Sequence, residues 1–265
     1  MELRGRLAVV TGASSGIGAA TARLLAREGF RVVLMARTES TLEEVAAGIR
    51  AAGGEATAVA ADLGDAALAT PAFERIVREM GAPDLLVNNA GAGRWLFTEE
   101  TPPSEAVAMM AAPYFAAFFA TRAFLPGMLA RGSGRIVNVN SPASKLPWPG
   151  AAGYSAARWA LRGFTEALRQ ELAGTGVGVT HFVAGKTSSD YFVHNPGAEE
   201  RIPRISKLIP TLTPDEAAAA LVRAVLRDAD EAVVPFMLRV FWICGSLTPG
   251  ITAWLLRNTG ARRPG

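Results

Sequence analysis

Short apolar runs alternate with helical patterns along most of the chain. Apolar runs of strand length occur at 7–10, 30–36, 55–61, 84–87, 135–139, 177–183 and 232–234. Runs of this length are typical of parallel strands that are buried on both faces. Between them, apolar residues recur at helical spacing, which predicts helices at 17–26, 40–50, 71–80, 104–131, 152–173 and 214–228.

The order of these elements predicts an α/β fold. Strands that alternate with helices form right-handed crossovers and pair in parallel, and a chain of 265 residues fits one large domain of this kind. Three residues indicate where the predicted helices are interrupted, begin or end. We expect Pro113 to interrupt the helix at 104–131, Pro126 to end it, and Thr213 to cap the helix at 214–228.

The stretch from Leu7 to Gly18, LAVVTGASSGIG, joins the first strand to the first helix. Glycines at 12, 16 and 18 permit a tight turn, a close approach of backbone to a pyrophosphate, and close packing of the helix. The helix N-terminus presents free N–H groups and a positive dipole end to an anion. A glycine-rich turn alone is also typical of a purely structural loop. Because a strand precedes this one and a helix follows it, the stretch predicts a nucleotide-binding turn.

The composition of the chain excludes several classes of protein. Half of the residues are apolar and 19% are charged, which is enough for a large core. The net charge of +3 comes from scattered arginines with no basic run beyond Arg262–Arg263, so nucleic acid is not an expected partner. The one cysteine, Cys244, excludes an intramolecular disulfide, gives no metal-site spacing and is interpreted as a small buried residue. We expect no signal peptide and a cytoplasmic location.

Five motifs, in this order, resemble the short-chain dehydrogenase/reductase family: Thr11–Gly18, Asp62, Asn88–Gly91, Ser141 and Tyr154. The resemblance covers about residues 5–235. It implies a Rossmann-type doubly wound sheet of about seven parallel strands with a dinucleotide at their carboxyl ends. It also implies hydride transfer between a nicotinamide and a carbonyl or hydroxyl carbon. We expect 1–235 to form the dinucleotide-binding and catalytic part of a single domain, and 236–265 its apolar C-terminal helical extension.

The resemblance places the cofactor. Asp62 and Leu63 would border the adenine, and Asn89–Gly91 the ribose and nicotinamide. The second strand ends on Ala36 and Arg37, without the acidic residue that favours NAD. A guanidinium there would pair with a 2′-phosphate, which favours NADP, although most arginines are simply solvated. No metal is expected, and the expected cofactor-binding residues are Gly12, Ser14, Ser15, Gly16, Ile17, Gly18, Arg37, Asp62, Leu63, Asn89, Ala90, Gly91, Tyr154, Arg158, Gly185 and Thr187.

The catalytic residues that the resemblance implies are Ser141, Tyr154 and Arg158. In the family a lysine four residues after the tyrosine supplies a positive charge, and arginine takes its place here. Arg158 keeps the charge but does not readily give up a proton. Ser141 lies thirteen residues before Tyr154 and matches the serine that hydrogen-bonds the substrate oxygen. The other interpretation of Ser141 is a serine that caps a loop at the end of a strand.

Two further positions depart from the family pattern. Pro113 stands where the family has an asparagine, and Ala184-Gly185-Lys186-Thr187 replaces a loop that usually begins Pro-Gly. Three hypotheses are therefore open: a reductase with an altered proton path, a slow or specialised reductase, and a protein that binds NADP(H) or a ligand without redox turnover. A non-enzymatic NADP-binding regulator or scaffold belongs to the third.

The segment 188–210 is where the family places its variable substrate lid. Its apolar residues favour a lipid-, steroid- or polyketide-like substrate, with an ordinary core cluster as the alternative. Other candidates to line the same pocket are Trp95, Phe97, Pro147 and Trp148, whereas Ser189 would reach the nicotinamide carboxamide with Thr187. His181 is interpreted as a structural residue in a strand and His194 as a loop residue.

The tail at 233–256 is unusually apolar, but Arg239 and Pro249 divide it into halves too short to span a bilayer. It predicts two short helices folded over the substrate entrance or packed against a partner subunit. Peripheral membrane contact, helped by the arginines at 257, 262 and 263, is a further hypothesis. The resemblance also implies a homodimer or homotetramer formed through the helices that hold Pro113 and Tyr154.

Overall fold

A seven-stranded sheet forms the centre of the computed structural model, which describes residues 5–189, 191–195 and 197–263. All neighbouring strands are parallel, in the order β3-β2-β1-β4-β5-β6-β7. This confirms the predicted doubly wound α/β fold. The strands are β1 (Leu7–Thr11), β2 (Arg31–Ala36), β3 (Glu55–Ala60), β4 (Leu85–Asn88), β5 (Gly134–Asn140), β6 (Val177–Ala184) and β7 (Glu231–Val234).

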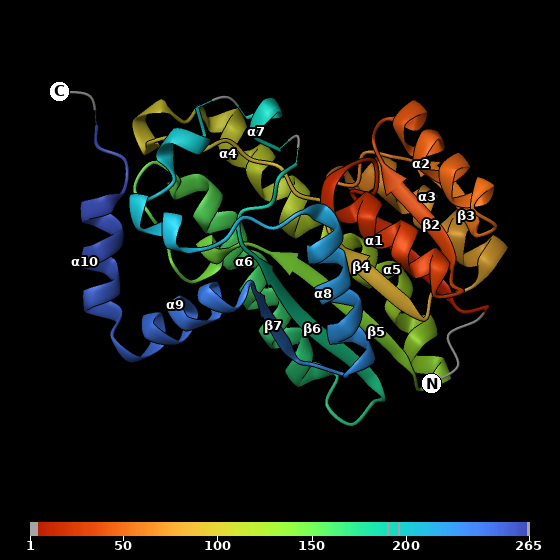
Figure 1. The fold of residues 1–265 in the computed structure, drawn as a ribbon. Coiled ribbons are helices and arrows are strands. Elements are labelled where there is room, and N and C mark those ends of the chain that lie inside the picture. The colour runs from red at the N-terminus through yellow and green to blue at the C-terminus, as the bar shows by residue number, and fades with distance from the viewer. Residues whose placement is uncertain (1–4, 190, 196, 264–265) are drawn as a thin grey trace.

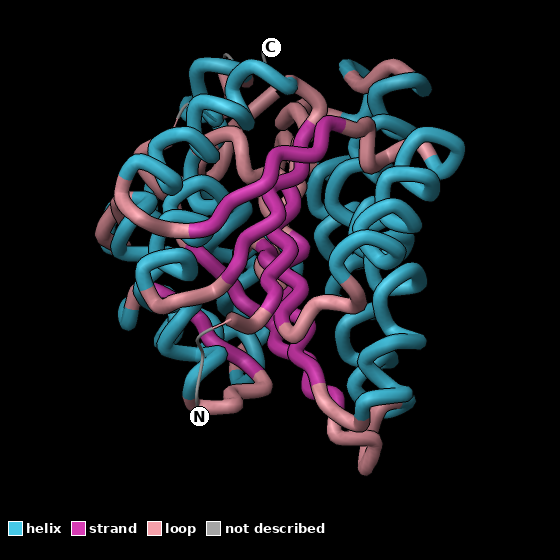
Figure 2. The backbone as a smooth tube through the Cα atoms, turned by 90° about the vertical axis from the view of Figure 1, so that its right-hand side faces the viewer, coloured by secondary structure: helices cyan, strands magenta, loops and turns pink. Residues whose placement is uncertain are grey.

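Helices cover both faces of the sheet, which Figure 2 shows nearly edge-on between two helical layers. The first layer contains α1, α2 and α8, and the second contains α3, α5 and α6. The helices are α1 (Gly16–Arg27), α2 (Glu39–Ala51), α3 (Ala66–Met80), α4 (Pro103–Met110), α5 (Ala116–Arg131), α6 (Ala152–Glu171), α7 (Tyr191–His194), α8 (Pro214–Leu226), α9 (Phe236–Leu247) and α10 (Pro249–Thr259).

Alternate residues of each central strand supply the two cores. In β1, Ala8 and Val10 pack with α1 and α8, while Leu7 and Val9 pack with α3 and α5. Strand order runs outward from β1 in one direction and from β4 in the other, so the crossovers diverge at this point. Such a divergence leaves a crevice at the carboxyl ends of the two strands, where ligands bind in folds of this type.

Pro113 interrupts the α-helix as expected, whereas Pro126 does not end it. Pro113 lies in a π-helical turn, η2 (Ala111–Phe115), that joins α4 to α5 and keeps the stretch helical where an α-helical hydrogen bond is missing. The expected end at Pro126 is wrong, since α5 continues to Arg131 with Pro126 on its exposed side. Gly132 caps the end of α5 in the left-handed conformation, with a φ of 65°, and its N–H donates to the Leu129 carbonyl at 3.0 Å.

The continuous helical stretch Pro103–Arg131 is long and apolar enough to cross a bilayer by length and composition, with a mean hydropathy of 1.3 in its most apolar window. In the structure 39% of that window is buried, and α5 packs against α3, β4 and β5. These are the contacts of a core helix.

Two other expectations are corrected. The helix expected at 71–80 begins at Ala66, because Asp65 caps it by accepting a hydrogen bond from the Ala67 N–H at 2.8 Å. Cys244, expected to be buried, is exposed on α9. The two short helices expected in the tail are present as α9 and α10, which extend away from β7 at the end of the molecule opposite α2 and β3 (Figure 1).

A test of the core concerns the edge-to-face pair of Phe73 and Phe124, whose ring centroids lie 5.4 Å apart. Phe124 is fully buried, so we expect Phe124→Ala to lower the free energy of unfolding by about 3–5 kcal/mol. Leu68 lies on α3, the helix of Phe73, and is 57% exposed, so Leu68→Ala is the control, with a clearly smaller loss. Urea denaturation monitored by circular dichroism measures both. Equal losses would contradict this placement of the core.

Candidate active site

The turn between β1 and α1 has the geometry of an anion cradle. Gly12 and Gly16 have φ values of 63° and 53°, which side-chain-bearing residues rarely adopt. A Cβ on Gly18 would lie 2.1 Å from the Gly12 carbonyl oxygen, so this glycine lets helix and turn approach each other. Ser15 occupies the N-cap position of α1 without a side-chain capping hydrogen bond. The first N–H groups of the helix are therefore available to a phosphate.

Hydrogen bonds tie this turn to the loop after β4. The Thr11 hydroxyl accepts from the N–H groups of Asn89 and Ala90, at 3.0 Å each. In return the Asn89 side-chain amide donates to the carbonyls of Thr11 (3.1 Å) and Gly12 (3.0 Å). Thr11 was not among the residues expected to bind the cofactor. Its position immediately before the first glycine is the only signal in the sequence that marks it.

One cavity of about 1660 Å³ extends from this turn along the carboxyl ends of the strands to the C-terminal helices. It contacts all of the residues expected to form the site except Gly18, which packs inside the turn. Expected site residues that line it are Gly12, Ser14, Ser15, Gly16, Ile17, Arg37, Asp62, Leu63, Asn89, Ala90, Gly91, Ser141, Tyr154, Arg158, Gly185 and Thr187.

Arg37 is exposed at the end of β2 and lines the nucleotide end of this cavity. Thr38 follows it at the N-cap position of α2, and its hydroxyl makes no capping bond. No ion pair of Arg37 occurs among residues 5–189, 191–195 and 197–263. Its guanidinium is therefore available to an anionic group in the cavity.

Ser141 follows the last residue of β5, where it caps a turn and also faces the cavity. Its hydroxyl accepts from the Ala143 N–H at 3.3 Å, which caps a short turn, and the residue also lines the cavity. Its own N–H donates to the side chain of Asn140 at 2.8 Å. The Asn140 amide in turn donates to the Arg158 carbonyl at 3.0 Å. Asn140 therefore holds the end of β5 against α6.

A buried histidine extends this connection across the sheet. His181 lies in β6 and accepts from Asn140 through Nε2 at 3.1 Å, which leaves Nδ1 facing Glu231 Oε1 at 3.2 Å. The hydrogen bond from His181 holds the pKa of Glu231 below its ordinary value of 4.5. Trp242 of α9 also donates to Glu231, at 3.1 Å. The strand residues near the site are thus linked to the first C-terminal helix.

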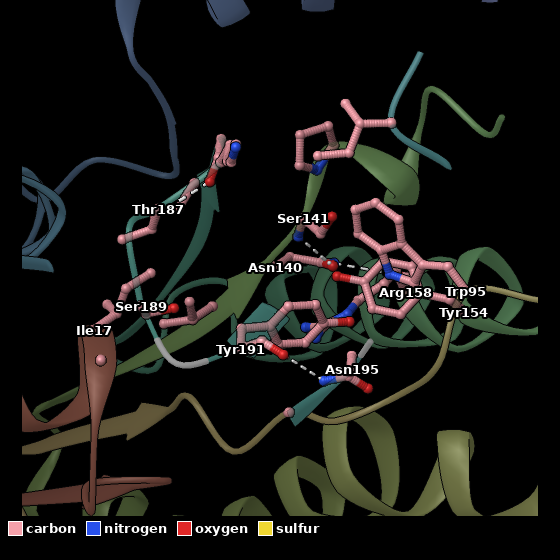
Figure 3. A pocket seen from close by; sticks show the side chains of 18 of the residues that line it. Ile17, Trp95, Asn140, Ser141, Tyr154, Arg158, Thr187, Ser189, Tyr191 and Asn195 are labelled. Atoms are coloured by element: carbon pink, nitrogen blue, oxygen red, sulfur yellow. Dashed lines mark hydrogen bonds between the residues drawn. The ribbon is translucent and has the colours of Figure 1, made fainter. Parts of the chain in front are cut away.

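Tyr154 and Arg158 lie one turn apart on α6 and are both buried. The Arg158 Cζ lies 4.9 Å from the centroid of the Tyr154 ring, so the guanidinium covers the ring. Its Nη2 approaches the loop after β4 so closely that a Cβ on Gly91 would lie 2.7 Å away. Arg158 Nε is buried without a hydrogen-bond partner in the described part of the chain. Figure 3 shows Ser141, Tyr154 and Arg158 on one side of the cavity.

Trp95 is the centre of an aromatic cluster next to Tyr154. Its ring centroid lies 5.6 Å from that of Tyr154, 5.1 Å from Trp148 and 5.9 Å from Phe192. Trp95 and Trp148 line the cavity as expected, but Phe97 and Pro147 do not. Phe97 lies instead beneath the guanidinium of Arg201, and Pro147 is exposed.

Tyr191 closes the cavity from the segment after β6. Its hydroxyl donates to the Gly93 carbonyl at 2.7 Å. Burial, and then the neighbouring Tyr154 phenol, raise the pKa of Tyr191 far above its ordinary value. Tyr191 therefore stays a neutral donor that ties the lid to the loop after β4. His194 belongs to α7 rather than to a loop, and its side chain lies outside the described residues.

Pro113, the position at which the resemblance leads us to expect an asparagine, lies away from the cavity. Pro113 is buried and does not line the cavity, and the nearby wall is made by Ala108, Ala111 and Ala112. This wall offers small apolar side chains where an amide would offer a hydrogen-bonding group. Residues 103–131 contain no asparagine or glutamine, so this segment offers no side-chain amide to the cavity.

Comparison with known proteins shows to which family this chain belongs. A model of the short chain dehydrogenase family matches residues 6–199. The chain belongs to the short-chain dehydrogenase family. Ketoacyl reductase HetN of Nostoc sp. is 34% identical over 232 residues, covering 88% of this chain and 79% of HetN. A metagenomic short-chain oxidoreductase solved in complex with NADP is 35% identical, has a TM-score of 0.73, and is matched over 98% of its length and 88% of this chain.

A longer relative is also similar. Probable oxidoreductase EphD of Mycobacterium tuberculosis is 36% identical over 234 residues, which cover 83% of this chain. The match covers 39% of EphD, so the short-chain dehydrogenase described here spans about two fifths of the length of that relative.

Gly12 offers a test of the turn. A Cβ there would lie 2.8 Å from the Ala90 Cα, and the φ of 63° is strained for alanine, so Gly12→Ala should lower the free energy of unfolding by about 1–3 kcal/mol. We expect it also to weaken NADPH binding by about tenfold or more, because the turn must shift. Gly48→Ala in α2, where nothing lies within 4 Å, is the control. Fluorescence titration and urea denaturation measure the two effects. Unchanged NADPH binding in Gly12→Ala would contradict this cradle.

Proposed function

We propose that the protein is an NADP(H)-dependent oxidoreductase that interconverts a carbonyl and a hydroxyl group on an apolar substrate. The observation that carries the proposal is the placement of Ser141, Tyr154 and Arg158 on the same cavity as the glycine-rich turn. A substrate held at this wall lies next to whatever the turn binds. The cavity of about 1660 Å³ exceeds the usual range for a single small ligand, so it has room for a dinucleotide and a substrate together.

Three features of the chain support NADP as the cofactor. The turn leaves the first N–H groups of α1 available to a pyrophosphate. Arg37 is positioned beside the nucleotide end of the cavity without a competing carboxylate at residue 36. Asp62 accepts from the Gly64 N–H at 3.0 Å, which holds the loop that would border the adenine. The related metagenomic oxidoreductase was solved with NADP, which supports the same preference.

The bound cofactor supplies or accepts the hydride, and the protein handles the proton. In the reductive direction the Ser141 hydroxyl hydrogen-bonds the substrate oxygen, and the Tyr154 phenol gives its proton to that oxygen. The guanidinium over the Tyr154 ring stabilises the negative charge that the phenol then carries. Arg158 does not itself pass a proton onward, because its guanidinium remains charged. Reprotonation of Tyr154 must therefore use another donor, which distinguishes this site from one with lysine.

The far half of the cavity favours an apolar substrate. Its walls come from the loop between β5 and α6, the segment 188–210 and the C-terminal helices. Their apolar side chains include Leu146, Phe192, Ile205, Leu208, Phe241 and Leu256. A chain or ring system of hydrocarbon would bury its surface there. The activity named for HetN, reduction of a ketoacyl group, supports a carbonyl attached to such a chain.

A second candidate function, binding of NADP(H) without redox turnover, is favoured by one observation. The Arg158 Nε is buried and unpartnered, and its guanidinium lies over the ring of Tyr154 and against Gly91. If this arrangement persists with the cofactor bound, the site holds a nucleotide but lacks a continuous proton path. Turnover assays separate the two functions.

For assembly we propose a homodimer or homotetramer formed through α5 and α6. These helices expose Phe118, Leu129 and Trp159 on the side away from the sheet. Phe118 and Phe164 pack together with ring centroids 5.6 Å apart, and they border a shallow groove between the two helices. Apolar groups exposed in this way are typical of a contact between subunits.

Arg37 provides a test of cofactor choice. We expect Arg37→Ala to weaken NADPH binding by about 10- to 100-fold, the usual effect of losing a charge-assisted hydrogen bond, with little change for NADH. Arg31→Ala is the matched control, because Arg31 is exposed at the other end of the same strand. Fluorescence titration with both nucleotides measures the change. An equal loss for NADPH and NADH would contradict a 2′-phosphate contact.

Tyr154 and Arg158 provide a test of catalysis. We expect Tyr154→Phe to lower the rate of NADPH oxidation with a panel of aliphatic and aromatic ketones by about 10²–10⁴-fold while NADPH still binds. Arg158→Lys should retain or raise the rate, since it restores a group that can transfer protons.

Arg162→Lys, one turn further along α6 and paired with Glu166, is the control and should not raise the rate. NADPH binding by the unaltered protein without turnover on any ketone, and with no gain in Arg158→Lys, would contradict the reductase and favour the binding function.

A further inference from the structure

The two C-terminal helices carry an unusual share of exposed apolar surface. Of the fifteen large apolar side chains exposed in the described part of the chain, seven lie on α9 and α10. In α9 four of them recur at spacings of four, three and four residues, which places them on one face of the helix. We call the seven the apolar face: Phe236, Met237, Val240, Ile243, Leu247, Ile251 and Trp254.

The opposite side of α9 accounts for the packing of the helix on the protein. Leu238 and Trp242 are buried against Leu146 and Val233. The apolar face takes no part in this packing. Phe236 and Leu247, at the two ends of α9, are each 76% exposed. Exposed apolar side chains grouped on one pair of helices mark a surface that contacts another apolar phase or molecule.

The charged residues around the apolar face favour a negatively charged partner. Residues 236–265 include four arginines and no aspartate or glutamate. Arg263 pairs with Glu99, whereas the ion pairs formed among residues 5–189, 191–195 and 197–263 do not include Arg239, Arg257 or Arg262. An apolar helix face flanked by unpaired arginines has the composition of a segment that lies in the interface of an anionic bilayer.

The cavity opens beside the same face. Met237, Val240 and Ile251 belong both to the apolar face and to the cavity lining, so the exposed surface continues into the mouth of the cavity. Cys244 of α9 and Leu255 of α10 also line the cavity. Figure 1 shows α9 and α10 projecting together at the end of the molecule farthest from α2. A contact made there would cover the mouth without obstructing the nucleotide turn.

We propose that α9 and α10 dock the protein on an anionic lipid surface, with the mouth of the cavity facing the bilayer. The twelve residues of α9 and the eleven of α10 are too short to cross a hydrocarbon core, which takes about 20 residues, so the helices lie in the interface. An apolar substrate dissolved in the lipid would then enter the cavity without passing through water.

Flotation of the purified full chain with vesicles tests the docking without any assay of activity. The vesicles are of phosphatidylcholine alone and of phosphatidylcholine with phosphatidylglycerol. We expect binding to the anionic vesicles, weakened by salt, and Phe236→Ser/Trp254→Ser should lower the partition coefficient at least tenfold. Arg239→Ser/Arg257→Ser should reduce binding to the anionic vesicles toward the level with phosphatidylcholine.

Val107→Ser is the control, because Val107 is 67% exposed on α4, outside the apolar face, and should leave binding unchanged. NADPH titration shows that each variant is folded, and Leu247→Ser serves if the double variant does not fold. Absence of binding to both kinds of vesicle, or equal binding by the apolar variant, overturns the proposal. Light scattering that finds a dimer dissociated by Phe236→Ser/Trp254→Ser, without vesicle binding, would assign the face to a second copy of the chain.

Discussion

The site depends on the hydrogen bonds between the end of β1 and the loop after β4. The Thr11 hydroxyl and the Asn89 amide join two loops that lie at the divergence of the sheet. Gly12 makes the approach possible, because any side chain there would meet the backbone of Ala90. One interaction therefore holds together the phosphate end of the cavity and the loop through Gly91 and Gly93 that meets Arg158 and Tyr154. In the function proposed above, this contact would couple the position of the cofactor to that of Tyr154 and Arg158.

Local patterns predicted the elements well, because buried parallel strands are continuous apolar runs that few other structures produce. All seven strand runs became strands of one sheet. The errors concern groups whose effect depends on tertiary surroundings. Pro126 was expected to end a helix, but its missing N–H lies on an exposed side where little is lost. The expectation that Cys244 is buried rested on its residue type alone. Cys244 is exposed because it lies on α9, of which only Leu238 and Trp242 are buried.

The residues of the site were predictable as a set, but their connections were not. Motif spacing identified Ser141, Tyr154 and Arg158, which do line one cavity. Spacing carries no information on Asn140 and His181, because their contacts join strands that are distant in sequence. Spacing also does not predict how the contacts of Arg158 differ from those of a lysine. Its guanidinium reaches both the Tyr154 ring and the Gly91 backbone because it is long and planar.

The connection from the site to the C-terminal helices gives those helices a reason to be rigid. Asn140 joins the end of β5 to α6 and to His181, His181 faces Glu231, and Glu231 accepts from Trp242 of α9. The helix that carries the mouth of the cavity is thus fixed to the same strands that carry Ser141. A displacement of α9 would have to break the Trp242 hydrogen bond or move β7, so the mouth and the proton-handling residues keep one relative position.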